Sequence, residues 1–141
     1  MKYIAAILLM ILAASVSAQS KTDKAKAEIR AVLDAQVVAW NAGDIDGFMR
    51  GYWNSPQTTF SGKNLTRGWQ PVLDNYKKNY DTPEKRGVLA FNNLEINILS
   101  KDSAYVVGEW AIKSATNPSG RFTLVFRKMK DGWRIVHDQT S

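Results

Sequence analysis

Apolar side chains recur at two different intervals along this chain, and the interval changes near residue 85. Between residues 29 and 80 they recur every three or four positions, which is the interval of an α-helix. From residue 88 to the end, apolar side chains recur at every second position, and the positions between them hold polar or further apolar residues; this interval of two is typical of β-strands. The sequence therefore predicts an α+β domain in which helices come first and an antiparallel sheet follows.

Three helices are expected in the first part of the chain. The first spans residues 22–42 and ends before Gly43, a residue suited to the left-handed conformation past a helix end. Asp44 is a typical N-cap for a short second helix, which Pro56 prevents from continuing. A stretch that favours a β-strand follows at residues 58–60. Apolar residues at helical spacing predict a third helix that stops near the next proline: Trp69, Val72, Leu73, Tyr76, Tyr80 and then Pro83.

Four strands are expected in the second part of the chain. Their predicted ranges are residues 88–98, 103–114, 121–130 and 133–141. Turn-forming residues separate them, such as the pair Asp131 and Gly132 before the last strand. The alternation in the first of these strands is interrupted at Asn92 and Asn93, where we expect a β-bulge.

The N-terminus has the pattern of a secretory signal peptide. One positive residue, Lys2, precedes an apolar run over residues 4–14, and small residues lead up to Ala18. The run is shorter than the roughly 20 residues that cross a bilayer, so a membrane anchor is the less favoured interpretation. We therefore expect residues 1–18 to be removed on export. Residues 19–141 would then form one domain, periplasmic or secreted, without attachment to the membrane.

Composition excludes several kinds of site. The chain contains no cysteine, which rules out disulfides and thiolate metal ligands, and a single histidine with scattered carboxylates offers no recognised metal-ligand spacing. Phosphate-binding and dinucleotide-binding motifs are missing as well, so we expect no metal and no cofactor. The net charge is +6, but the basic residues are spread along the chain, and we expect no nucleic-acid partner.

Both faces of the later strands carry large apolar side chains. In the strand predicted over residues 103–114, Val106 and Trp110 share one face, while Tyr105 and Val107 share the other. Because one face of such a sheet packs on the helices, a second apolar face favours pairing with another copy of the chain. The sequence therefore predicts a homodimer joined through its sheets.

The candidate acid and base residues lie on the later strands. His137 is the only histidine, the residue type that titrates nearest neutral pH, and is the first candidate for a general acid or base. Strict alternation puts His137 on the same face as Ile135 and puts Asp138 on the opposite face, so a partner for His137 must come from another strand. Glu109 is the first candidate for that partner. Two other interpretations remain open: a purely structural hydrogen bond for His137 and an ordinary ion pair for Glu109.

Aromatic side chains are numerous enough to line a cavity. The candidate ligand-binding residues are Trp40, Tyr52, Trp53, Trp69, Trp110 and Arg121. Tyrosine and tryptophan can orient a ligand through their polar tips, although the same side chains could form an ordinary core. Arg121, or Arg127, could also pair with Glu109.

Five motifs extend across the mature chain. They are Trp-Asn-Ala-Gly-Asp at 40–44, Gly-Trp at 68–69, Val-Gly-Glu-Trp at 107–110, Phe-Thr-Leu-Val-Phe-Arg-Lys at 122–128 and Asp-Gly-Trp-Arg-Ile-Val-His-Asp at 131–138. Together they resemble the nuclear transport factor 2-like superfamily, and within it the small bacterial SnoaL-like domains. The resemblance implies a cone-shaped, cystatin-like fold, in which three N-terminal helices pack on a curved antiparallel sheet and a pocket opens at one end.

The resemblance transfers no catalytic residue. Ketosteroid isomerase, an enzyme of similar shape, keeps an Asp base near the strand after its second helix, where this chain has Thr58, Thr59 and Phe60. The last strand also resembles that of the calcium/calmodulin-dependent kinase association domain. Gln139 stands where many relatives have a second histidine, which argues against a two-histidine site.

Three functions remain open at this point. The favoured one is an exported domain that binds a small, largely apolar molecule in its pocket and forms a homodimer. The second is a lyase or isomerase that uses His137 with Glu109 or Asp138 for proton transfer. The third is an assembly module whose own aromatic side chains fill the pocket.

Overall fold

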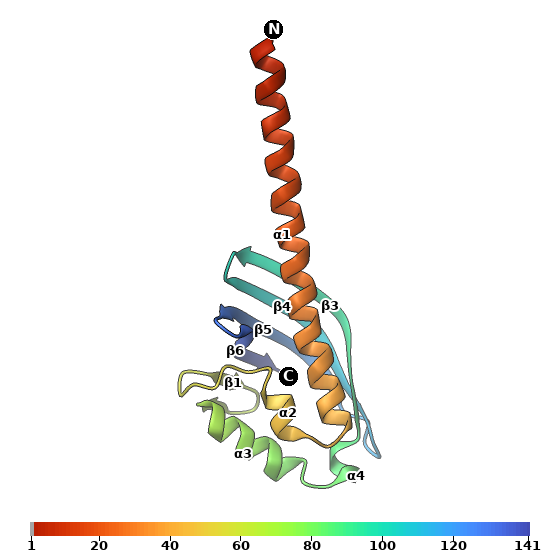
Figure 1. Cartoon of the computed structure of the whole chain (residues 1–141). Coiled ribbons are helices and arrows are strands. Elements are labelled where there is room, and N and C mark those ends of the chain that lie inside the picture. Colours follow the sequence, from red (N-terminus) through yellow and green to blue (C-terminus); the bar gives the residue numbers. More distant parts are fainter. Residues whose placement is uncertain (1) are drawn as a thin grey trace.

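The computed structural model describes the backbone of residues 2–141 and the side chains of residues 19–141 (Figure 1). Its helices are α1 (Lys2–Asn41), α2 (Ile45–Met49), α3 (Trp69–Asn79) and α4 (Pro83–Arg86). Its strands are β1 (Thr59–Ser61), β2 (Leu65–Arg67), β3 (Val88–Ser100), β4 (Ser103–Lys113), β5 (Ser119–Met129) and β6 (Gly132–Thr140). The predicted signal peptide, residues 1–18, lies outside the part of the chain whose side chains are described, and its cleavage stays a prediction.

The strands form one curved, six-stranded sheet in the order β2-β1-β6-β5-β4-β3. β1 runs parallel to β6, and the other neighbouring strands are antiparallel. Helix α1 crosses the concave face, where it contacts β3 and β6, and α3 lies against the short strands β1 and β2 (Figure 1). The α+β architecture and the curved antiparallel sheet predicted from the sequence are confirmed.

Helix α1 packs on the sheet through one stripe of side chains. Ile29, Leu33, Gln36 and Trp40 follow one another at intervals of three or four and are each no more than 2% exposed. The helix ends at Asn41, and Gly43 has the positive φ of 80° expected past a helix end. This stripe is the one that the sequence pattern predicted, although the helix itself begins at Lys2 rather than at residue 22.

Two short elements correct the predicted arrangement. Pro83 does not merely end the preceding helix but opens a further turn, α4, in which Thr82 accepts a hydrogen bond from the main-chain N–H of Lys85. Proline is tolerated at the first position of a helix because that N–H needs no helical partner. The described part of the chain therefore has four helices instead of three. Strand β2, which pairs with β1, is too short to produce a recognisable alternation.

The core lies between the helices and the concave face of the sheet. Its side chains come from alternate positions, including Ala104 and Val106 of β4 and Phe122, Leu124 and Phe126 of β5, each no more than 5% exposed. Burial of this apolar area is the main favourable contribution to folding. Within the described part of the chain, no helix is both long enough and apolar enough to span a bilayer.

Candidate functional site

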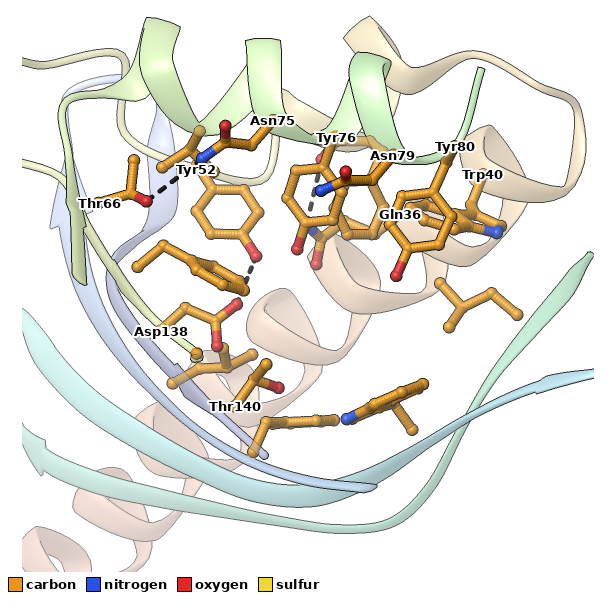
Figure 2. Close-up of a pocket in the computed structure, with 18 of the residues that line it drawn as sticks. Gln36, Trp40, Tyr52, Thr66, Asn75, Tyr76, Asn79, Tyr80, Asp138 and Thr140 are labelled. Atoms are coloured by element: carbon orange, nitrogen blue, oxygen red, sulfur yellow. Dashed lines mark hydrogen bonds between the residues drawn. The ribbon is translucent and has the colours of Figure 1, made fainter. Parts of the chain in front are cut away.

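A cavity of about 380 Å³ lies between the concave face of the sheet and helices α1, α2 and α3. Most of the residues around it are aromatic or aliphatic, among them Trp40, Phe48, Tyr80, Phe91, Trp110 and Phe122. Figure 2 shows Tyr76 of α3 and Tyr80, which caps the end of that helix, on one side of the hollow and Asp138 and Thr140 of β6 on the other. The volume falls in the range typical of sites for small organic molecules.

Asp138 is the buried acidic group of this cavity. Its side chain is 5% exposed, and its Oδ2 accepts a hydrogen bond of 2.6 Å from the hydroxyl of Tyr52 (Figure 2). Its Oδ1 is buried without a hydrogen-bond partner among the described residues. Burial raises the pKa of Asp138 to about 7, and the bond from Tyr52 only partly offsets this effect. Near neutral pH the carboxyl can therefore either donate or accept a hydrogen bond.

Tyr52 is held in place by main-chain pairing against β6. The main-chain N–H of Trp53 donates to the carbonyl of Ile135 at 2.9 Å, and the N–H of Ile135 donates to the carbonyl of Gly51 at 2.9 Å. Burial, and then the neighbouring charge of Asp138, raise the pKa of Tyr52, so its hydroxyl stays protonated and serves as a donor.

Helix α3 adds a second tyrosine hydroxyl to this end of the cavity. Burial raises the pKa of Tyr76, again with a contribution from Asp138. Figure 2 shows the ring of Tyr76 directed into the hollow next to Tyr52. Asp138 thus shares its surroundings with two protonated phenols and a largely apolar wall, an arrangement suited to one polar group of a ligand.

The alternation of side chains along β6 breaks at Val136. Ile135 and His137 pair with adjacent residues of β5, which leaves Val136 in a β-bulge. The residues after the bulge therefore change faces, and Asp138 points into the cavity with the same orientation as Ile135. Strict alternation placed His137 on the face of Ile135 and Asp138 on the opposite face, and this prediction is wrong for both residues.

His137 and Glu109 do not line the cavity, and each interacts with a different partner. Nδ1 of the half-buried His137 is 2.7 Å from the hydroxyl oxygen of Thr59 on the neighbouring strand β1. Glu109 accepts from the side-chain amide of Asn93 at 2.8 Å and lies 3.7 Å from the guanidinium Nε of Arg121. The predicted pairing of His137 with Glu109 is therefore wrong, and each residue instead has an ordinary structural partner.

The candidate ligand-binding residues divide into two groups. Trp40, Tyr52 and Trp110 line the cavity, whereas Trp53, Trp69 and Arg121 do not. Trp69 is occupied elsewhere, since its indole N–H donates to the carbonyl of Met49 at 2.9 Å. The side chain of Arg121 is 80% exposed on the outer face. The second group therefore lies outside this cavity.

Gln36 and Tyr76 also line the cavity, although the sequence indicated them only as members of helical stripes. Nε2 of Gln36 donates to the carbonyl of Phe48 at 3.0 Å, which ties α1 to α2. A polar residue within an apolar stripe is the signal that could have identified Gln36, because a buried amide needs partners. No comparable signal separated Tyr76 from core aromatics. Among the described residues, no cluster of acidic, histidine or cysteine side chains has the arrangement of a metal site.

Comparisons with known proteins agree with this fold. The model of a family described as the SnoaL-like domain matches residues 29–141. An NTF-2 like protein of unknown function from Shewanella oneidensis is 39% identical, with a TM-score of 0.78 over 82% of this chain and 98% of that one.

Two further solved structures are similar in fold alone. An NTF2-like superfamily protein from Salmonella enterica serovar Typhimurium is 22% identical, with a TM-score of 0.69 over 85% of this chain and 92% of the other. A protein with a cystatin-like fold from Caulobacter vibrioides is 18% identical, with a TM-score of 0.70 over 84% and 89%. No curated protein matches the sequence.

Proposed function

Because the chain belongs to the family of SnoaL-like domains, with an NTF2-like fold, we propose that it binds a small, largely apolar molecule in the cavity. The observation that carries the proposal is a hollow of about 380 Å³ with a mainly apolar wall and one buried carboxyl. Binding sites for small molecules typically combine such a wall with a few convergent polar groups. Asp138 and Tyr52 would supply those groups here.

Native mass spectrometry of the protein purified from its own host tests this proposal. We expect an additional bound mass that is released on activation. Thr140→Trp puts an indole into the cavity on the same face as Asp138 and should abolish the bound mass. Gln139→Trp, at the adjacent exposed position, should retain it. Wild-type protein without any ligand, or equal occupancy in the two variants, would favour the assembly module instead.

Acid–base catalysis of the lyase or isomerase type is the second candidate function. It is favoured by the pKa of about 7 that burial gives to Asp138, since a carboxyl with this pKa can release and take up a proton near neutral pH. The role first given to His137 thereby passes to Asp138. The ligand released in the previous experiment can be incubated with the protein in heavy water. Deuterium incorporation by the wild type, but not by Asp138→Asn, would favour catalysis, and no incorporation by either would favour binding alone.

Homodimer formation is proposed through the outer face of the sheet. Val107 is 37% exposed there, and its neighbours Tyr105 and Val125 are half-buried. Light scattering coupled to size-exclusion chromatography should give twice the mass of the chain. Val107→Glu should reduce this mass to that of a monomer, whereas Val38→Glu, on the exposed side of α1, should not. A monomer for the wild type would contradict the proposal.

Export with cleavage after Ala18 is proposed from the sequence pattern alone. N-terminal sequencing of the protein made in its own host should begin at Gln19. A product that begins at Met1 would contradict the proposal.

A further inference from the structure

Two polar atoms of the cavity residues are buried without a hydrogen-bond partner among the described residues. They are Oδ1 of Asp138 and Nε1 of Trp110. Buried polar atoms nearly always have a partner, so two exceptions that border one cavity require an explanation. A ligand that pairs with both atoms explains the two exceptions together.

The unpaired indole of Trp110 differs from the other indoles near it. Trp40, which lines the same cavity, donates from Nε1 to the carbonyl of Arg86 at 3.1 Å. Trp69, outside the cavity, donates to the carbonyl of Met49 at 2.9 Å. The fold thus satisfies these two indoles with main-chain carbonyls and leaves the N–H of Trp110 for another partner.

The two unpaired atoms belong to different ends of the concave face. In the register of the sheet, Asp138 lies opposite Leu124 of β5, and Trp110 lies opposite Gly120 of the same strand. These positions on β5 are four residues apart, which corresponds to about 13 Å along the strand. Asp138 and Trp110 also stand on opposite sides of β5, in β6 and β4. The buried ring of Phe122 lies between these two positions and gives the wall an apolar surface there, next to the side chain of Thr140, which pairs with Phe122 on β6.

We propose that the ligand is an elongated, uncharged molecule with an apolar body and an oxygen function at each end. This inference rests on the binding function proposed above and specifies its ligand. At one end a hydroxyl bonds to Asp138, because a hydroxyl can donate to a carboxylate and accept from a carboxylic acid. At the other end an oxygen accepts from the N–H of Trp110. When Asp138 is ionised, a ligand carboxylate beside it is disfavoured by repulsion of like charges.

Solvent reaches neither of the two atoms. Binding must therefore turn the carboxyl and the indole toward the ligand. This movement can be observed, because each indole N–H gives its own signal in the NMR spectrum of the nitrogen-15-labelled protein.

Three compounds that share one rigid apolar body test the inference: biphenyl, para-hydroxybiphenyl and para,para′-dihydroxybiphenyl. Each added hydroxyl is expected to tighten binding about five- to tenfold, the effect of one neutral hydrogen bond. Dissociation constants come from the NMR titration. The indole signal of Trp110 should move downfield with the dihydroxy compound, and that of Trp69 should stay in place.

Two matched variants separate the hydrogen bond from the shape of the cavity. Trp110→Phe removes the unpaired N–H, and Trp40→Phe makes the same change at an indole whose N–H already has a partner. We expect Trp110→Phe to lose the gain from the second hydroxyl. Trp40→Phe should keep that gain, even where it weakens the binding of all three compounds.

The outcomes distinguish this inference from the function on which it rests. Equal affinities of the wild type for the monohydroxy and dihydroxy compounds would overturn the inference and leave the binding function intact. The same conclusion would follow if both variants changed the gain from the second hydroxyl equally. No binding of any of the three compounds would count against the binding function itself, and with it the inference.

Discussion

Replacing Asp138 by asparagine should stabilise the protein at alkaline pH. Burial raises the pKa of Asp138 from its ordinary value of 3.8 to about 7. Between these values the folded chain holds a proton that the unfolded chain has released, so the free energy of unfolding falls as the pH rises and stays low above the folded pKa. About three pH units, at roughly 1.4 kcal/mol each, correspond to a loss of about 4 kcal/mol between about pH 4 and pH 8. Asparagine still offers Tyr52 an acceptor but has no proton to release.

Urea unfolding followed by tryptophan fluorescence at several pH values measures this effect. From about pH 4 to pH 8, the unfolding free energy of Asp138→Asn relative to wild type should rise by about 4 kcal/mol. Asp74→Asn makes the same chemical change on the exposed surface of α3 and should stay within about 0.5 kcal/mol of wild type at every pH. If the difference between Asp138→Asn and wild type did not vary with pH, the carboxyl would not be buried as described.

Three further substitutions have defined outcomes. Tyr52→Phe removes the 2.6 Å hydrogen bond to Asp138 and should lower the unfolding free energy by about 1–3 kcal/mol. Because that bond favours the ionised carboxyl, the pKa of Asp138, followed by carboxyl-carbon NMR, should rise in this variant. An unchanged or lower pKa would contradict the contact. His137→Ala should leave the amount of co-purified ligand in native mass spectra unchanged, because His137 bonds to Thr59 outside the cavity. A loss of ligand would indicate that His137 takes part in binding. Phe126→Ala should lower the free energy of unfolding in urea by about 3–5 kcal/mol, because removal of the fully buried ring leaves a cavity in the core. A loss below about 1 kcal/mol would contradict the burial of this ring.

Two of the bulges of the sheet, at Asn93 and at Val136, show why one local feature could be predicted and another could not. Asn93 has a positive φ of 52°, a conformation that asparagine tolerates better than most residues, and the pair Asn92 and Asn93 signalled that bulge in the sequence. Val136 sits between two residues that fit a regular strand, and it carries no comparable signal. This second bulge decides which of His137 and Asp138 faces the cavity.

The helical stripes and the alternation of the strands were predictable because each depends on the spacing of apolar residues along the chain. The stripe from Ile29 to Trp40 is buried as expected. The position of the cavity wall was not predictable in the same way. Trp69 and Trp110 both occupy regular apolar positions, but only Trp110 borders the hollow. That difference depends on how α3 lies against the curved sheet, which spacing does not encode.

A crystal structure of the protein purified from its own host, without denaturant, tests most directly whether the cavity holds a ligand. We expect electron density for a small molecule between α3 and the concave face, within hydrogen-bonding distance of Oδ1 of Asp138. Side chains packed into that space, or a molecule bound beside His137 on the outer face instead, would contradict the proposed site.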